Sequence, residues 1–174
     1  DYIKEKLYQQ LAIDYCCKIS DIKDDKNHFM EYKKIEGRRQ FEEADDCVLK
    51  VIAVNGKLIF TGKKSVVDVC QKQFSNKSGN WFMDVVNFRK LDEILKKEGY
   101  RIKTVHPFFI PKDDHVYEIN GVEIKKYKQE EILQFKDDDR FDEAFCFSEA
   151  SPDVLAVAAI IDNEIVGMAG ARAD

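Results

Sequence analysis

The sequence predicts an α/β protein of the α+β type, made of two small domains. Asn-Gly pairs flanked by β-forming residues indicate tight hairpins, and apolar residues spaced three and four positions apart indicate amphipathic helices. An extended stretch bracketed by Pro107 and Pro111 separates two groups of these elements. We therefore expect an N-terminal α/β domain at residues 1–111 and a second domain at residues 112–174.

The composition is that of a globular protein. Of 174 residues, 44% are apolar and 35% are charged, which excludes a disordered chain. The formal net charge of −5 argues against a nucleic-acid partner, because phosphates require a basic surface. No stretch approaches the roughly 20 apolar residues of a membrane helix, so we expect no membrane partner. The five cysteines lack metal-site spacing, and we expect reduced thiols in a cytoplasmic protein without a metal centre.

The first domain is expected to begin with an amphipathic helix over residues 2–18, because apolar residues recur there at four-residue intervals. A polar, charge-rich stretch at residues 20–34 follows, with a loop expected at Asp24-Asp25 and with Phe29, Met30 and Tyr32 expected to attach part of it to a core. Gly99 is placed to end a later helix, since glycine adopts the left-handed C-cap most easily. The further elements expected are hairpin strands at 48–54 and 57–61, helices at 65–74 and 87–98, and a strand at 100–105.

The second domain is expected to contain two hairpins around a helical segment. The strands of the last hairpin are apolar at nearly every position, which predicts that both faces are covered. The elements expected here are hairpin strands at 116–119 and 122–127, helices at 129–135 and 141–147, and hairpin strands at 154–161 and 164–170.

The closing hairpin also carries a family resemblance. It reads Val-Ala-Ala-Ile-Ile, then the turn Asp-Asn-Glu, then Ile-Val-Gly-Met-Ala-Gly-Ala. This resembles the second and third strands of the GNAT superfamily of N-acetyltransferases, with 122–127 as the first strand and the two helices after it on the substrate side. A weaker similarity, through residues 91–100 and 106–111, is to the amino-terminal domain of a bacterial two-domain branch of that family.

The resemblance implies transfer of an acetyl group from acetyl-CoA to an amine carried by a small molecule or a peptide. Glu143, Phe145 and Phe147 then border the acceptor pocket, with simple packing as the alternative role for the same residues. Arg172 then meets a phosphate of the cofactor, with plain solvent exposure as the alternative. Catalytic residues remain unassigned.

One departure from the family pattern limits this expectation. The family holds the cofactor pyrophosphate with a loop of the form Q/R-x-x-G-x-G/A at a helix N-terminus, and no such run occurs in these residues. The glycines at 167 and 170 have different spacing and lie inside a predicted strand. We therefore expect a truncated, inactive portion of the enzyme, with an open sheet edge after Gly170 through which a homodimer can form.

Two other functions compete with this one. The first is a non-catalytic α/β module for binding or self-association. The second is an unrelated enzyme that uses a metal at Asp137, Asp138 and Asp139, for which a solvated acidic loop is the alternative. Trp81 and Phe82 either line a ligand pocket or belong to the core.

Overall fold

A computed structural model describes residues 2–38, 47–110, 118–149 and 151–172. Contacts between residues divide the chain into two compact units, Asp1–Pro111 and Lys112–Asp174, which are described separately. Each unit combines helices with a three-stranded sheet, which confirms the predicted α+β class.

The sheet of the first unit is built around a fully buried central strand, β3. Its strands are β1 (His28–Glu31), β2 (Leu49–Val54) and β3 (Lys57–Gly62), in the order β1-β3-β2. The β2–β3 hairpin is antiparallel and turns at Asn55-Gly56, where both residues have positive φ, as the Asn-Gly signal predicts. Strand β1 runs parallel to β3 and lies in the charge-rich stretch where the sequence predicted no strand, because four residues give too short a pattern to recognise.

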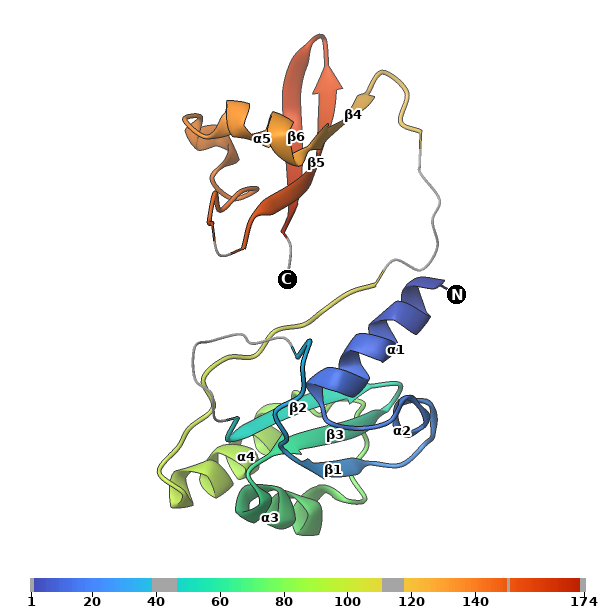
Figure 1. Ribbon diagram of the computed structural model, residues 1–174, viewed down its shortest axis with the longest axis vertical. Coiled ribbons are helices and arrows are strands. Elements are labelled where there is room, and N and C mark those ends of the chain that lie inside the picture. Colours follow the sequence, from blue (N-terminus) through green and yellow to red (C-terminus); the bar gives the residue numbers. More distant parts are fainter. Residues whose placement is uncertain (1, 39–46, 111–117, 150, 173–174) are drawn as a thin grey trace. The chain divides into compact units, whose positions relative to one another are not determined.

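Helices cover both faces of this sheet (Figure 1). They are α1 (Tyr2–Asp14), α2 (Ile19–Lys23), α3 (Lys64–Phe74) and α4 (Val85–Lys97). Leu58 and Phe60 of β3 face α3 and α4, whereas Ile59 between them packs with α1 and α2. The strand is therefore buried on both sides because successive side chains point to opposite faces.

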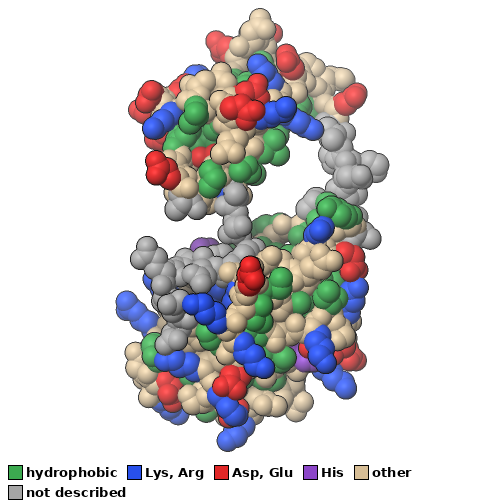
Figure 2. All heavy atoms as spheres, in the orientation of Figure 1, with side chains coloured by type: hydrophobic (Ala, Val, Ile, Leu, Met, Phe, Trp, Pro, Cys, Tyr) green, Lys and Arg blue, Asp and Glu red, His purple; other side chains and the backbone are tan. Residues whose placement is uncertain are grey.

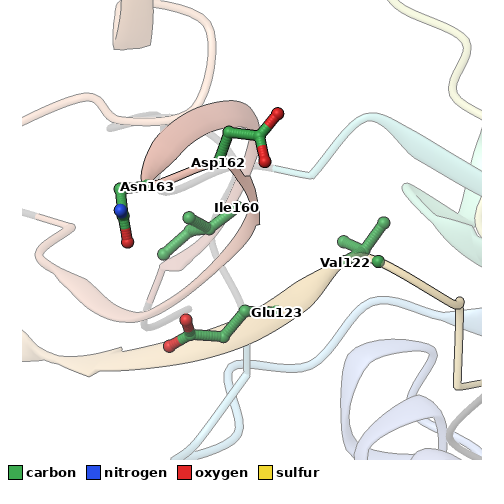
Figure 3. A pocket seen from close by; sticks show the side chains of 6 residues that line it. Val122, Glu123, Ile160, Asp162 and Asn163 are labelled. Carbon is green, nitrogen blue, oxygen red and sulfur yellow. The ribbon is translucent and has the colours of Figure 1, made fainter.

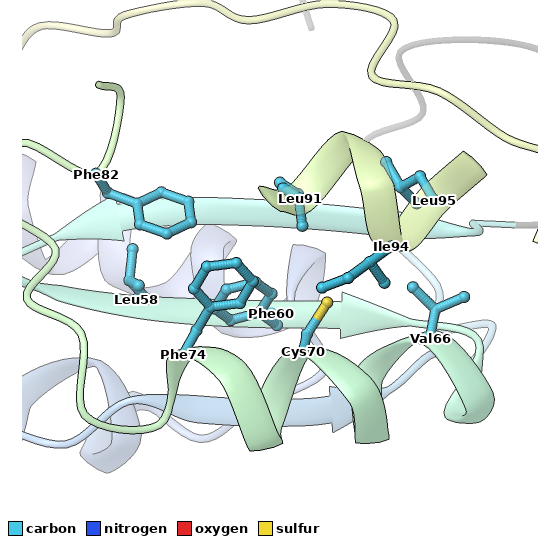
Figure 4. Close-up of a cluster of buried hydrophobic side chains, with 9 residues drawn as sticks. All are labelled: Leu58, Phe60, Val66, Cys70, Phe74, Phe82, Leu91, Ile94 and Leu95. Atoms are coloured by element: carbon cyan, nitrogen blue, oxygen red, sulfur yellow. The ribbon is translucent and has the colours of Figure 1, made fainter. Parts of the chain in front are cut away.

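Aromatic rings fill the centre of the larger core (Figure 4). The ring of Phe60 lies 5.7 Å from that of Phe74, and the ring of Phe82 meets Phe74 edge-on at 5.4 Å. Phe82 is thus a core residue, but its neighbour Trp81 is 82% exposed and has a φ of 58°. The two halves of the Trp-Phe pair therefore face opposite environments.

Two expectations for the first unit are wrong. The first helix ends at Asp14 rather than residue 18, because Cys16 adopts a φ of 55° that ends the helix. The loop expected at Asp24-Asp25 is confirmed and lies between α2 and β1. Residues 100–105 form no strand. α4 ends at Lys97, Gly99 follows it with a φ of 82°, and the N–H of Ile102 donates to the Asp92 carboxylate instead of a neighbouring strand.

The second unit is an antiparallel sheet with the order β4-β5-β6. Its elements are β4 (Glu123–Lys128), α5 (Gln129–Ile132), the 3-10 turns η1 (Leu133–Phe135) and η2 (Asp139–Phe141), β5 (Asp153–Ile161) and β6 (Glu164–Arg172). The closing hairpin is confirmed, with its turn at Asp162-Asn163. The predicted helix at 129–135 is one turn of α-helix followed by 3-10 turn.

Two elements predicted for the second unit differ from the structure. Residues 141–147 are turns and loop after η2, because Asp153 accepts the N–H groups of Cys146 and Phe147 that a helix would use internally. Strand β4 pairs with β5, and residues 118–119 are not in a strand; residues 116 and 117 of that predicted hairpin lie outside the described residues. Within the described residues, β4 therefore pairs with the central strand β5 rather than with residues 118–119.

The core of the second unit lies on one face of its sheet. It consists of Tyr127, Ile132, Phe135, Phe141, Phe145, Ala156 and Ala158. The other face is open, since Leu155 is 44% and Val166 is 59% exposed. The predicted cover on both faces is therefore wrong for the described residues, because α5, η1 and η2 all lie between β4 and β5 in sequence and pack on the same side.

None of the helices in the described ranges combines the length and apolarity needed to cross a bilayer.

Truncation of the aromatic core should destabilise the first unit strongly. Phe74→Ala removes a fully buried ring and leaves a cavity, so we expect a loss of about 3–5 kcal/mol in the free energy of unfolding, measured by urea denaturation. Val69→Ala on the same helix is the control, because Val69 is 39% exposed and should cost no more than about 1 kcal/mol. Equal losses for both variants would contradict the packing described here.

Candidate functional site

The three residues predicted to bind the acceptor lie on the segment between η2 and β5. Phe145 is 6% exposed, and its ring stacks on Phe135 with 5.9 Å between centroids, so it occupies the core as the packing alternative requires. Phe147 is half-buried, with its ring 5.5 Å from that of Phe145. Glu143 is exposed. Phe147 and Glu143 are thus the members of this set that can meet a ligand.

A buried carboxylate fixes this segment to the sheet. Asp153, 6% exposed at the start of β5, accepts hydrogen bonds from the backbone N–H of Phe147 at 2.8 Å and of Cys146 at 3.1 Å. These bonds hold Phe147 at a φ of 50°, a conformation that most residues avoid. Sequence reasoning missed Asp153, because a single acid before an apolar strand has no distinctive local pattern.

The structure brings Arg172 to the same end of the sheet. Arg172 lies opposite Asp153 in the β5–β6 register, and Asp153 accepts the hydrogen bond from the Phe147 N–H. Two residues before Arg172, a Cβ on Gly170 would lie 2.1 Å from the Ala144 carbonyl oxygen, so only glycine permits this close approach. The segment carrying Glu143 and Phe147 therefore crosses the end of β6 that carries Arg172, although 25 or more residues separate them in sequence.

An open hollow of about 390 Å³ lies at the opposite end of this sheet (Figure 3). Carboxylates from β4 and from the β5–β6 turn border it, namely Glu123 and Asp162. The other lining residues are Gly121, Val122, Ile160 and Asn163. The hollow contains none of the residues predicted from the sequence, and its width leaves both carboxylates exposed to water.

The acidic loop at residues 137–139 has one of its carboxylates neutralised by a neighbouring arginine. Asp138 accepts from the Arg140 guanidinium, with 2.6 Å between its Oδ2 and the Arg140 Nη2, and this hydrogen bond lowers the pKa of Asp138 below its usual value. Asp137 and Asp139 are exposed. The loop therefore resembles the solvated alternative more than a metal cage, since hard metal ions require several converging oxygens.

A tighter cluster of polar groups occurs in the first unit, where Asp21, Asp24 and His28 place one ligand atom each within 4.8 Å of the others. The centre of this cluster is approached by an ammonium group. Lys57 Nζ donates to the backbone oxygens of Asp21 at 2.5 Å and Asp24 at 2.6 Å, and to Asp24 Oδ1 at 2.9 Å. A metal ion here would have to displace a lysine that is only 2% exposed.

The charges of this cluster alter two pKa values. The Lys57 ammonium, followed by His28, holds the pKa of Asp24 far below its ordinary value. Burial, with a smaller contribution from the Asp21 carboxylate, raises the pKa of the Cys17 thiol to about 11. Cys17 is therefore a protonated thiol at neutral pH and a poor nucleophile. Sequence reasoning missed the cluster, because Lys57 follows a hairpin turn, where a lysine is usually exposed.

The first unit also has a basic hollow of about 570 Å³ beyond the end of α4. Its lining consists of Lys96, Gly99, Tyr100, Arg101 and Lys103. Lys96 is paired with the Asp92 carboxylate at 2.7 Å, which cancels part of the positive charge.

Charge is distributed unequally between the two units. Residues 112–174 contain 7 Lys and Arg against 16 Asp and Glu, a net charge of −9, whereas residues 1–111 contain 21 against 17, a net charge of +4. Figure 2 shows acidic side chains scattered over the visible face of the second unit. This unit therefore favours cationic over anionic small molecules near its surface.

Compared with known proteins, the chain matches no family model, no curated protein and no solved structure.

Replacing the buried lysine should destabilise the first unit. Lys57→Met removes the ammonium from two carbonyl oxygens and one of several donors from the Asp24 carboxylate, and we expect a loss of about 3 kcal/mol in the free energy of unfolding, measured by urea denaturation. Lys64→Met is the matched control: its ammonium is 65% exposed and pairs with Asp68, so the loss should stay below about 1 kcal/mol. A stable Lys57→Met protein would refute the structural role.

The same cluster predicts a specific acid dependence. The folded state lowers the pKa of Asp24, so the carboxylate stabilises the fold above its unfolded pKa of about 4, and this stabilisation is lost as the pH falls. Asp24→Asn should therefore be less stable than wild type at pH 7 and should lose less stability between about pH 5 and pH 2. Urea denaturation at stepped pH measures this difference. Asp25→Asn, an exposed neighbour, should keep the wild-type profile.

Proposed function

We propose that this chain is part of a cytoplasmic N-acetyltransferase of the GNAT type, which transfers the acetyl group of acetyl-CoA to an amine. The order of elements in the second unit is the main support. A first strand is followed by short helical segments on one face of the sheet and then by two antiparallel strands, β5 and β6. This is the order that the resemblance of the closing hairpin implies for the first half of such a domain.

The acceptor side of the proposal rests on charge and on the segment before β5. Amines are cationic at neutral pH, and the net charge of −9 on residues 112–174 attracts them. The exposed Glu143 carboxylate can pair with such a cation. Phe147, which is half-buried on the same segment, offers an apolar surface. The acceptor must lose a proton before it reacts, and no base is assigned among the described residues.

In the proposed reaction the amine nitrogen attacks the carbonyl carbon of the thioester. The new C–N bond forms, the C–S bond breaks, and coenzyme A leaves as a thiolate that takes up a proton. We propose that Arg172, at the end of β6 next to the acceptor segment, contacts a phosphate of the cofactor. Because these 174 residues contain no Q/R-x-x-G-x-G/A run, we propose that they do not turn over acetyl-CoA by themselves.

The second candidate is a non-catalytic module for binding or self-association. The open apolar face of the second sheet favours it, because exposed apolar surfaces commonly mark interaction sites. The two candidates differ in one respect that is easy to measure: only the enzyme binds acetyl-CoA.

Acetyl-CoA binding tests the proposal on the complete gene product. At a cofactor concentration about 100 times the Kd, the native state gains about 2.7 kcal/mol, and the Tm should rise by about 5–10 °C in scanning fluorimetry. Release of the coenzyme A thiol in the presence of amines should accompany this rise. The 174-residue chain alone should release none.

Two variants locate the contact with the cofactor. Arg172→Ala should weaken acetyl-CoA binding about tenfold, because it removes a charge-assisted bond to phosphate. Arg140→Ala is the control within the same unit and should leave the affinity unchanged, since Arg140 pairs with Asp138. A complete gene product whose Tm does not respond to saturating acetyl-CoA would overturn the proposal.

A further inference from the structure

The hollow beyond the end of α4 concentrates positive charge. Its volume of about 570 Å³ is within the range of small-molecule sites, and Lys96, Arg101 and Lys103 all line it. The chain at residues 96–103 contains four basic residues against one acid, a net charge of +3. This concentration favours an anion over a cation as the occupant of the hollow.

The last carbonyl groups of α4, beside this hollow, accept hydrogen bonds from the chain that follows. The Leu95 oxygen accepts from the N–H of Tyr100 at 2.9 Å. The Lys96 oxygen accepts from the N–H of Gly99 at 3.1 Å, and Gly99, with a φ of 82°, turns the chain back toward the helix. These bonds reduce the repulsion that the carbonyl groups of a helix C-terminus would exert on an anion.

A carboxylate of α4 holds the two sides of the hollow together. Asp92 Oδ2 lies 2.7 Å from Lys96 Nζ, and Asp92 Oδ1 accepts the N–H of Ile102 at 3.1 Å. The Lys96 ammonium, with a smaller contribution from the Arg101 guanidinium, lowers the pKa of Asp92 below its usual value. The charges of Lys96 and Arg101 are therefore close together, on a segment that Asp92 fixes to the helix.

Tyr100 gives the hollow an aromatic wall. Its side chain is 40% exposed and lines the hollow beside the basic residues. Lys63 Nζ donates to the Tyr100 hydroxyl at 3.1 Å and lies 5.3 Å from the ring centroid, so the ring is held in place and a further cation lies next to it. A ligand that combines an anionic group with a flat apolar group can therefore contact both Arg101 and Tyr100.

We propose that this hollow binds a small phosphate monoester, with the phosphate on Arg101 and Lys96 and an aromatic part of the ligand against Tyr100. A phosphate monoester carries about two negative charges at neutral pH, which suits a site with several cations. The planar N–H groups of arginine bind two phosphate oxygens at once. The inference concerns the first unit alone and does not depend on the acetyltransferase proposal.

Calorimetric titration of the 174-residue chain at constant ionic strength tests the proposal with three probes. Phenyl phosphate should bind about tenfold more tightly than inorganic phosphate, because its ring contacts the Tyr100 side chain. It should also bind more tightly than benzoate, which has the same ring but a single negative charge. A chain that binds no phenyl phosphate at millimolar concentrations, or that binds benzoate equally well, overturns the proposal.

An arginine substitution locates the phosphate. Arg101→Gln should weaken the binding of phenyl phosphate by about tenfold or more, because it removes charge-assisted hydrogen bonds to the phosphate. Arg89→Gln is the matched control: Arg89 is also an exposed arginine of the same unit, on α4, but it does not line the hollow, so the affinity should stay unchanged. Equal weakening by both substitutions would show that the overall charge attracts the ligand, and the proposal would fail.

A tyrosine substitution locates the ring of the ligand. Tyr100→Ala should remove the preference for phenyl phosphate over inorganic phosphate, because the aromatic wall is lost while Arg101 remains. Circular dichroism of each variant verifies that the fold is retained. If folded Tyr100→Ala protein keeps the full preference for phenyl phosphate, the ligand lies elsewhere and the proposal is wrong.

Discussion

The buried ammonium of Lys57 connects the central strand of the first unit to the chain segment before it. Lys57 is the first residue of β3, and its three hydrogen bonds reach the backbone and side chain of the α2–β1 region. The Asn27 side chain continues this connection: it donates to the carbonyl of Phe74 at the end of α3 and accepts from the N–H of Leu58. Because Lys57 itself is buried, removing its ammonium would leave partly buried oxygens without one of their donors.

The second unit uses the same device around a carboxylate. Asp153 accepts two backbone N–H groups from the segment before β5, and the absence of a side chain at Gly170 lets that segment approach the sheet. The aromatic cluster of Phe135, Phe141 and Phe145 then fills the space beneath it. The position of the candidate acceptor residues thus depends on one buried acid and one glycine rather than on a helix.

The two outer strands of the second sheet differ in charge. β4 carries Glu123, Lys125, Lys126 and Lys128, whereas β6 carries charge only at Glu164 and Arg172. Charged side chains on an outer strand oppose pairing with a further strand, so β4 is the better protected of the two.

The sequence by itself determined those elements whose signals are local. Turn chemistry and periodicity act within a few residues, so four features were predictable. These are the Asn55-Gly56 turn, the apolar spacing of α3 and α4, the cap at Gly99 and the β5–β6 hairpin. Only the tertiary structure decided that β1 forms, that β4 pairs with β5, and that one face of the second sheet stays open. It also decided which polar groups meet, as Lys57 and Asp24 do, because contacts between residues more than 30 positions apart leave no pattern in the local sequence.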